Sequence, residues 1–224
     1  MSERIKVRQL KQLRTFEVAL EKHGLGPVAG VDEAGRGACC GPITIASCIL
    51  PPQPIKELEI LTDSKKLSER QRAALFPRII DNALDYRILH IPAYEIDALG
   101  IQHANISGMR RVVETLNVRP GFVLIDAMKV PGLTSPSLSV IGGDGQVRCI
   151  AAASVLAKYS RDEVMKELSQ RYPEYGLEKH KGYGTKAHMA AVSRHGKIAE
   201  HRYSYANVKY AQAQWERNSR RLEG

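Results

Sequence analysis

Four acidic side chains stand where strand-like apolar runs end. Asp32 and Glu33 follow the run PVAGV, Asp126 follows FVLI, and Asp144 comes shortly after the run over residues 137–141. Acids at strand ends can converge although they are distant in sequence, because ligands bind at strand ends in α/β sheets. Gathered carboxylates raise one another's pKa unless a cation lies among them, and oxygen ligands suit hard cations such as Mg²⁺ or Mn²⁺. The sequence therefore predicts a metal-dependent carboxylate site.

The chain is strongly basic. Lysine and arginine number 33 against 24 acidic residues, which gives a formal charge of +9 and a sequence pI near 9.4. Such an excess accelerates encounter with polyanions. A chain that attracts phosphates would not otherwise collect acids in its groove. Metal ions explain both features, because they bridge carboxylates to a phosphodiester. The charge alone does not separate DNA from RNA, catalysis from storage, or either from a generic basic protein.

The remaining composition favours a globular protein of 224 residues. Its four cysteines lack a C-x-x-C pair, so we expect buried reduced thiols instead of disulfides or zinc ligands, and the spacing of His180, His188 and His201 fits no usual zinc set. The N-terminus is charged where a signal peptide needs an apolar core, and no stretch approaches the ~20 apolar residues of a membrane span. We expect a cytoplasmic protein without a membrane segment.

The elements that must position the acids follow from periodicity and turn residues. Apolar spacing predicts an amphipathic helix over residues 5–22, closed by Gly24 and Gly26. The runs PVAGVD and GPITIASCIL, joined by a polar turn, predict two strands that form a hairpin. Ser68 is an N-cap candidate in a capping box, before a helix that ends near Ile80. Further strands are expected over residues 86–91, 122–126 and 137–141, and further helices over 101–116 and 149–170.

The run from Asp32 to Gly37, DEAGRG, resembles the start of the bacterial type 2 ribonucleases H, ribonuclease HII. Similar motifs follow in the family's order and cover residues 27–205. They are DSKKLS from Asp63, LID from Leu124, GD at Gly143, AASVLAK from Ala152, SRD from Ser160, YPEYG from Tyr172, HKGYGT from His180 and HR at His201.

The resemblance implies an α/β ribonuclease H-like fold, with a mixed central β-sheet flanked by helices and a C-terminal helical subdomain. We expect an N-terminal helix within residues 1–26 and a catalytic core over 27–172. Residues 173–224 would form a basic helical appendage that completes the substrate groove. A monomer is expected.

The resemblance also implies an endonuclease that hydrolyses the RNA strand of RNA–DNA hybrids and cuts at ribonucleotides embedded in duplex DNA. Asp32, Glu33, Asp126 and Asp144 would be both the catalytic and the metal-binding set. They would support two-metal hydrolysis with Mn²⁺ or Mg²⁺, giving 5′-phosphate and 3′-hydroxyl ends. Asp162 is an alternative to Asp144 as the fourth acid, although its helical setting beside Arg161 favours an ion pair.

Substrate contacts are implied for a second group of residues. Gly35, Arg36 and Gly37 would recognise the ribose 2′-hydroxyl through a closely approaching backbone, and Tyr183 would stack near the ribonucleotide. Five basic residues are expected to contact phosphates: Lys65, Lys66, Lys158, Arg161 and Lys181. Ser154 is a further phosphate candidate, although a helical serine among alanines more often packs. The basic end over residues 217–221 would add non-specific affinity.

Four positions depart from the family pattern without touching the acids. They are Ala38, Ala127, Gly142 and Tyr205, where the family has proline, glycine, lysine and phenylalanine. Two other functions stay open. A non-catalytic protein could bind hybrids, but it would gain affinity by losing the acids. A related two-metal nuclease acting on DNA alone would leave the glycine run and Tyr183 without a role.

Overall fold

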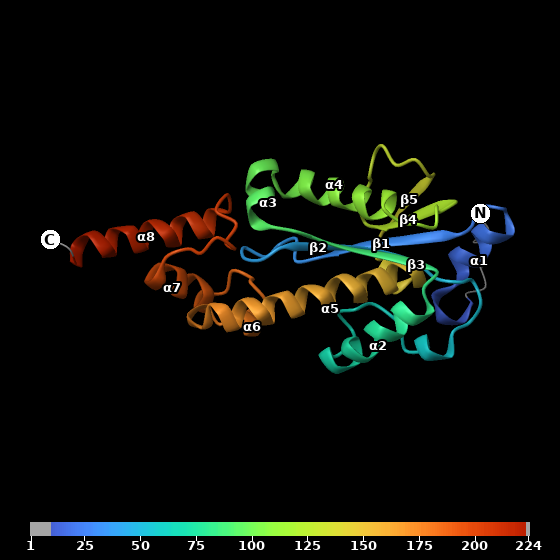
Figure 1. The fold of residues 1–224 in the computed structure, drawn as a ribbon, viewed down its shortest axis with the longest axis horizontal. Coiled ribbons are helices and arrows are strands. Elements are labelled where there is room, and N and C mark those ends of the chain that lie inside the picture. Colours follow the sequence, from blue (N-terminus) through green and yellow to red (C-terminus); the bar gives the residue numbers. More distant parts are fainter. Residues whose placement is uncertain (1–9, 223–224) are drawn as a thin grey trace, which may run out of the picture. The chain divides into compact units, whose positions relative to one another are not determined.

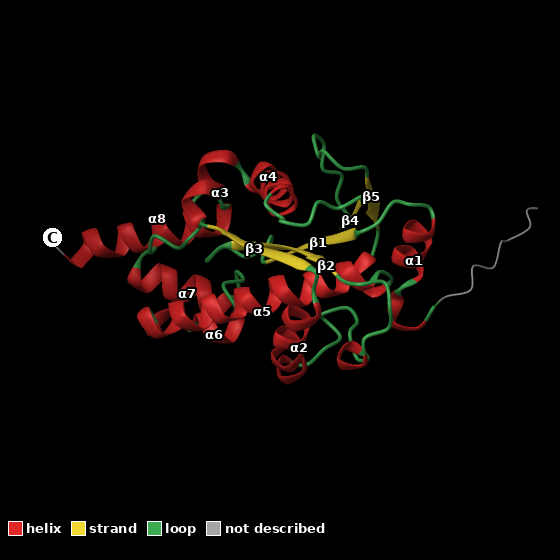
Figure 2. Cartoon of the chain, turned by 45° about the vertical axis from the view of Figure 1, so that its right-hand side comes forward, coloured by secondary structure: helices red, strands yellow, loops and turns green. Residues whose placement is uncertain are grey.

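The computed structural model describes residues 10–222 and contains one five-stranded sheet of order β3-β2-β1-β4-β5 (Figures 1 and 2). The strands are β1 (Val28–Ala34), β2 (Ile43–Ile49), β3 (Asp85–Ile91), β4 (Phe122–Asp126) and β5 (Ser137–Val140). β4 pairs in parallel with both β1 and β5. The link from β1 to β2 is shorter than the ~12 residues that a parallel crossover needs, so these two neighbours run antiparallel. The sheet is therefore mixed, as expected.

Helices occupy most of the remaining chain. They are α1 (Thr15–Lys22), α2 (Glu69–Asn82), α3 (Ala93–Leu99), α4 (Ile101–Glu114), α5 (Arg148–Arg171), α6 (Leu177–His180), α7 (Lys186–His195) and α8 (Ala206–Leu222), with 3₁₀ turns at Lys11–Leu13, Lys56–Leu58, Gly143–Gly145 and Pro173–Tyr175. The predicted capping box is confirmed, because Ser68 Oγ accepts from Gln71 N while Gln71 Oε1 accepts from Ser68 N. None of the helices in the described range is both long and apolar enough to span a membrane.

The chain divides into two compact units. Unit 1 contains the residues up to Asp32, Ala46–Arg87 and Met109–Leu156, and unit 2 contains Glu33–Ile45, Ile88–Gly108 and the residues from Ala157 onward. Each unit has its own apolar core. The core of unit 1 joins Val28, Leu124, Val140, Val147, Cys149 and Ile150. The core of unit 2 joins Cys40, Met165, Leu168, Tyr175, Leu177, Val192 and Ala211.

Within unit 1 the sheet is covered closely by helices. A Cβ atom on Gly30 of β1 would lie 2.1 Å from the carbonyl carbon of Cys149 in α5, so the helix backbone lies directly on the strand. Ser47 Oγ of β2 donates to Val112 O of α4 over 2.8 Å. Figure 1 shows α4 and α5 on opposite faces of the strands. This packing fixes β1, which carries Asp32, and its neighbour β2.

The expected helix over residues 5–22 is wrong for its first described part. The α-helix begins only at Thr15, and Gln12 has a left-handed backbone (φ 60°). The reason is tertiary: Gln12 Nε2 donates to Ile55 O over 2.9 Å, and Ile55 N donates back to Gln12 Oε1 over 3.0 Å. Residues 5–9 lie outside the described range. Phe16 and Leu20 pack against the core of unit 1, as their spacing predicted.

Helix α3 was not predicted. It follows Pro92, which occupies its N-cap position, and it ends at Gly100, whose φ of +80° breaks the helix before α4 starts. Between Pro173 and Leu222 the chain forms a 3₁₀ turn and the helices α6, α7 and α8, joined by loops, as expected of a helical C-terminal part. The proposed boundaries at residues 26 and 172 stay predictions.

Candidate active site

Asp32 and Asp126 lie side by side near the C-terminal ends of the two parallel strands β1 and β4. The last residue pair between β1 and β4 joins Val31 to Ile125, and each acid is the next residue of its strand. Neighbouring strands lie ~4.8 Å apart. Asp32 is only 5% exposed. The two acids that sequence reasoning placed at strand ends therefore meet at one edge of unit 1.

Asp144 reaches the same edge through a tight turn. β5 pairs with β4 up to Asp126, after which Gly142 adopts a left-handed conformation and a 3₁₀ turn begins at Gly143. The Gly143 N–H donates to Asp126 Oδ1 over 2.7 Å. This bond fixes the turn against Asp126 and places Asp144, the following residue, beside it.

The negative charges of the neighbouring acids affect the ionisation of Asp144. Burial raises the pKa of Asp144, Lys65 partly offsets this effect, and the nearby carboxylates of Asp63 and Asp126 raise the pKa further. Carboxylates that disfavour one another's ionised form are relieved by a cation placed among them. The donor atoms are all oxygens, which fit a hard divalent ion.

Lys65 places an ammonium group among the acids. Its Nζ lies 3.4 Å from Asp144 Oδ2. Burial lowers the pKa of Lys65, but Asp144, Asp32 and Asp63 outweigh that effect, so the net shift is upward. The side chain is 78% exposed, whereas that of Asp144 is 8% exposed. Lys65 can therefore exchange its carboxylate partner for a phosphate without disturbing packed structure.

Asp63 is a member of the site that sequence reasoning noted only as part of a motif. Besides its effect on Asp144, its Oδ1 accepts from Lys65 N over 2.9 Å. The next residue, Ser64, is hydrogen-bonded to Ser154 over 2.8 Å. Ser154 is 4% exposed, so it packs α5 against this loop, the more common role for a helical serine. The sequence did offer a signal for Asp63, because an aspartate directly before a pair of lysines is a candidate member of an acidic site.

Asp162 forms the ion pair that its helical setting favoured. Its Oδ1 lies 2.5 Å from Lys158 Nζ, one helical turn earlier, and Asp162 is 2% exposed. The ion pair joins Asp162 to Lys158, and the charge of Asp162 also acts on the adjacent Arg161. Asp144, in contrast, directly follows Gly143, whose N–H donates to Asp126, so the geometry favours Asp144 over Asp162 in the carboxylate set.

The glycine run forms a tight turn in unit 2, immediately after Glu33, which is half-buried. Ala38 N donates to Gly35 O over 3.2 Å and closes the turn. Gly35 has a φ of +83°, and a Cβ atom there would lie 1.8 Å from Arg161 Nε. Glycine is therefore required at this position both by its backbone and by the space available. Arg36 is exposed, and its Nη2 donates to Gln102 Oε1 over 2.6 Å.

Tyr183 faces this turn within unit 2. A Cβ atom on Gly37 would lie 3.8 Å from Tyr183 Cε1, an ordinary van der Waals distance. The tyrosine is 44% exposed, as its glycine neighbours suggested. The Arg161 guanidinium lies 5.8 Å from the ring centroid. An exposed aromatic ring and an exposed glycine backbone thus face each other.

Arg161 does not have the exposure that a phosphate contact requires, so that prediction is corrected. It is 1% exposed and donates to the carbonyls of Pro42, Lys181 and Cys40. Burial, together with the charge of Arg202, lowers the pKa of Arg161 to about 10. Arg161 therefore stabilises the fold, because it donates hydrogen bonds to three backbone carbonyls in the interior of unit 2. The phosphate contacts expected of Lys66, Lys158 and Lys181 stay predictions.

A second group of metal-ligating atoms lies in the core of unit 2. Donor atoms of Cys40, His188 and His201 all lie within 4.8 Å of one another, a proximity that the sequence spacing did not suggest. The ring nitrogens of His188 and His201 are hydrogen-bonded without an ion. Ile198 N donates to His201 Nδ1, so His201 Nε2 carries the proton and donates to His188 Nε2 over 3.0 Å. His188 Nδ1 then donates to Tyr183 O over 3.0 Å. The carboxylates are spaced more widely, since no three of them between residues 10 and 222 meet the same limit.

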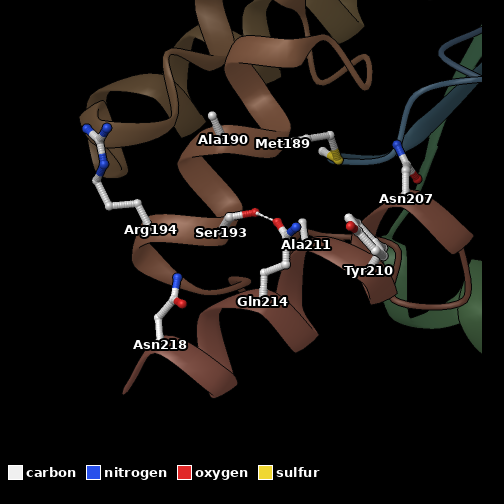
Figure 3. A pocket seen from close by; sticks show the side chains of 9 residues that line it. All are labelled: Met189, Ala190, Ser193, Arg194, Asn207, Tyr210, Ala211, Gln214 and Asn218. Atoms are coloured by element: carbon white, nitrogen blue, oxygen red, sulfur yellow. Dashed lines mark hydrogen bonds between the residues drawn. The ribbon is translucent and has the colours of Figure 1, made fainter. Parts of the chain in front are cut away.

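A surface pocket lies between α7 and α8 (Figure 3). Ser193 of α7 donates to Gln214 of α8 across it over 2.7 Å. The lining residues are Met189, Ala190, Ser193, Arg194, Asn207, Tyr210, Ala211, Gln214 and Asn218. None of the predicted site residues is among them, and the set contains no acid, histidine or cysteine. This pocket lacks the carboxylate, imidazole and thiol groups that metal binding requires.

A model of the family Ribonuclease HII matches residues 29–208. The chain belongs to the ribonuclease HII family. The Ribonuclease HII of Corynebacterium diphtheriae is 69% identical over 210 residues, covering 94% of this chain and 92% of the relative. The Ribonuclease HII of Mycolicibacterium smegmatis is 57% identical over 205 residues, covering 92% of this chain and 75% of the relative.

Solved structures confirm the fold. The crystal structure of ribonuclease H2 from Pyrococcus horikoshii matches with a TM-score of 0.75 and 26% identity, covering 85% of this chain and 99% of that one. Bst-RNase HIII in complex with Mn²⁺ matches with a TM-score of 0.73 and 20% identity, covering 96% and 77%. The expected ribonuclease H-like fold with a helical C-terminal part is therefore confirmed. Ribonuclease HII relatives act on RNA, and this chain is an enzyme of that family.

Proposed function

We propose that this ribonuclease HII family member hydrolyses the RNA strand of RNA–DNA hybrids and also cuts at single ribonucleotides embedded in duplex DNA. The observation that carries the proposal is the meeting of Asp32, Asp126 and Asp144 at one edge of the sheet, in a chain of formal charge +9. A basic protein attracts phosphates, and buried acids would repel them unless cations lie between. The products would carry 5′-phosphate and 3′-hydroxyl ends.

The residues fit divalent ions. Asp32, Glu33, Asp126 and Asp144 would hold Mn²⁺ or Mg²⁺, with two ions during catalysis. Such ions, when bound, activate the attacking water and stabilise the leaving oxygen. Burial raises the pKa of Asp144, and Asp63 and Asp126 raise it further, which supports this assignment because a bound cation would stabilise the ionised carboxylate. Bst-RNase HIII, which shares the fold, was determined in complex with Mn²⁺.

The chain's own groups would bind and orient the substrate. Lys65 would move from Asp144 to a backbone phosphate as the substrate enters, and Lys66, Lys158 and Lys181 would contact further phosphates. The backbone of the Gly35–Gly37 turn, which is exposed at Arg36 and Gly37, would recognise the ribose 2′-hydroxyl, the group that distinguishes RNA from DNA. Tyr183 would stack on the sugar or base beside it. We also propose that the enzyme acts as a monomer in the cytoplasm.

The test is product mapping on an end-labelled DNA duplex that contains one central ribonucleotide. With Mg²⁺ or Mn²⁺ we expect a single cut at the ribonucleotide, with the ends stated above, and with EDTA no cut. The all-DNA twin of the same sequence is the control. Binding of hybrids without any metal-dependent cut would favour a non-catalytic binding protein, and equal cutting of both duplexes would favour a DNA nuclease.

A further inference from the structure

The glycine turn is held from inside by a buried arginine. Arg202 is 0% exposed, and its guanidinium donates to Gly35 O over 2.8 Å, to Arg36 O over 2.9 Å and to Gly41 O over 3.1 Å. One planar group therefore holds two carbonyls of the turn and a third carbonyl shortly after it. With its carbonyls directed at Arg202, the turn has little freedom to tilt about its glycines.

Tyr205 extends this contact. Its hydroxyl donates to Arg36 O over 3.0 Å and accepts from Arg202 Nη1 over 3.1 Å. Arg202 also lies over the Tyr205 ring, 5.6 Å from the centroid. The Arg36 carbonyl thus receives two donors from residues that are three positions apart. Phenylalanine at position 205 would keep the ring and lose one of these two donors.

His201, the residue before Arg202, is connected to the loop that carries Tyr183. His201 donates to His188, which donates to the backbone carbonyl of Tyr183. The backbone of residues 201–202 also pairs with the segment that follows the glycine turn. His201 forms an isolated β-bridge with Cys40, and Arg202 N donates to Cys39 O over 2.8 Å. Two adjacent residues therefore hold the glycine turn and the Tyr183 loop.

The segment that contains these residues is itself anchored. Asp97 of α3 accepts from Tyr203 N over 2.8 Å and from Ser204 N over 2.9 Å. The backbone between His201 and Tyr205 is thereby tied to a helix of the same unit. It provides a fixed reference that positions the Gly35–Gly37 turn and the loop that carries Tyr183.

We propose that residues 201–205 form a positioning segment that sets the separation between the Gly35–Gly37 backbone and Tyr183, and thereby the preference for ribose over deoxyribose. Its members are positioning residues and not catalytic ones, because they act through the turn and the tyrosine. The inference rests on the proposed function for its effect on substrate choice. Its effect on the turn itself does not depend on any substrate.

The first experiment compares Tyr205→Phe with Tyr210→Phe, a matched control on α8 that removes an exposed hydroxyl. Amide hydrogen exchange is followed in peptides that cover residues 35–41, with those that cover β4 as an internal reference. Tyr205→Phe is expected to accelerate exchange in 35–41 by about fivefold, the effect of one hydrogen bond, and to leave β4 unchanged. Unchanged exchange in 35–41, or an equal acceleration in Tyr210→Phe, overturns the proposal.

The second experiment measures substrate preference in the same variants. Affinity is compared for a duplex with one ribonucleotide and for its all-DNA twin, with Ca²⁺ in place of the catalytic ions. Tyr205→Phe is expected to lower the ratio of the two affinities by about fivefold, with the affinity for all-DNA duplex unchanged. A merely structural role would weaken both affinities alike, and that result contradicts the proposal.

Arg202→Lys is the stronger variant, because an ammonium group cannot span three carbonyls as a guanidinium does. Arg202→Lys is expected to accelerate amide exchange in residues 35–41 more than Tyr205→Phe does. It should also lower the ratio of the affinity for the ribonucleotide duplex to that for its all-DNA twin more than Tyr205→Phe does. If it does not fold, Tyr205→Phe alone decides the outcome. Failure of the wild type to cut a ribonucleotide would remove the proposed function and leave the exchange result intact, so the two failures are distinguishable.

Discussion

At the scale of single residues, the two glycines of the turn have different requirements. Gly35 has a left-handed backbone and lies against Arg161, so any side chain there would displace a buried arginine. Gly37 has an ordinary backbone, and a methyl group would meet only Tyr183 Cε1, at 3.8 Å. The first glycine is required by the fold, whereas the second leaves room that a substrate can occupy.

Gly37→Ala should therefore separate recognition from stability. The added methyl group would occupy the space between the turn and Tyr183 and keep the 2′-hydroxyl from the backbone. We expect cleavage at a single ribonucleotide to fall by roughly 10- to 100-fold, the cost of leaving a buried polar group unpaired, with an unchanged melting temperature. Steady-state kinetics and thermal unfolding check this. Full activity would exclude Gly37 from ribose recognition.

Asp126→Asn should remove catalysis and keep binding. The amide oxygen can still accept from Gly143 N, so the turn that carries Asp144 stays in place. We expect hydrolysis to fall by more than about 100-fold, because even residues that only orient metal ligands cost ~10–100-fold. Hybrid affinity should be equal or higher, since a negative charge facing phosphates is gone. Single-turnover kinetics and fluorescence anisotropy are the measurements, and undiminished turnover would refute the assigned role.

The sequence allows a residue to be located when the pattern of its own strand determines where it lies. Asp126 was predictable because an apolar run ends at it, and strand ends meet at a sheet edge. Arg202 was not, because its partners at Gly35 and Arg36 are far away in the chain and no local pattern marks a buried guanidinium. Arg161 was misassigned for the same reason: an arginine on a helix gives no sign of the carbonyls that it will meet.

At the scale of elements, the approach of α5 to β1 holds the acids in register. Gly30 lies two residues before Asp32 and touches the α5 backbone at Cys149. Sequence periodicity predicted both elements but not this contact, because a glycine within a strand reports neither its partner nor its distance. In the same way, apolar spacing predicted a helix through Gln12, where two hydrogen bonds to Ile55 prevail.

Gly30→Ala should push α5 away from the sheet. A Cβ atom 2.1 Å from backbone cannot be accommodated by rotating a side chain. We expect a loss of about 1–3 kcal/mol in the free energy of unfolding, the usual cost of overpacking, together with lower activity as Asp32 shifts. Gly145→Ala, whose Cβ atom would meet nothing within 4 Å, is the control for stability. Equal stabilities in chemical denaturation would contradict the prediction.

The His188–His201 pair should make stability depend on pH. Burial lowers the pKa of His188 from 6.5 to about 4, and burial together with His188 lowers that of His201 to about 3. The unfolded chain therefore takes up protons first as the pH falls below about 6.5, and stability is lost progressively down to about pH 3. Above that window the pair contributes no pH dependence. In melting curves across this range, His201→Gln should show a shallower decline than wild type, while His103→Gln, at an exposed site, should not.

At the scale of the whole molecule, the formal charge of +9 determines how the enzyme meets nucleic acid. Part of that charge is exposed near the end of α8, at Arg217, Arg220 and Arg221. Composition alone predicted a polyanion partner, but it could not indicate which cations are exposed. Arg161 and Arg202 show the difference, because both count towards the charge while they are buried against carbonyls.

Replacing Arg217, Arg220 and Arg221 by glutamine should weaken hybrid binding without slowing the chemical step. Every phosphate that the helix end no longer neutralises should reduce the slope of log affinity against log salt by ~0.9. We expect a shallower slope and an unchanged kcat at saturating substrate, measured by anisotropy titrations at several salt concentrations and by steady-state kinetics. A slope equal to that of wild type would exclude this helix end from phosphate binding.

The four free cysteines divide evenly between the two units. Cys48 and Cys149 belong to unit 1, and Cys39 and Cys40 to unit 2; all four are buried. Burial raises the pKa of each thiol, for Cys40 and Cys48 to about 12. The thiolate is the reactive form, so alkylating reagents can modify these positions only when the surrounding structure opens. Mass spectrometry of the modified cysteines would thus time the opening of each half of the molecule separately, without any introduced label.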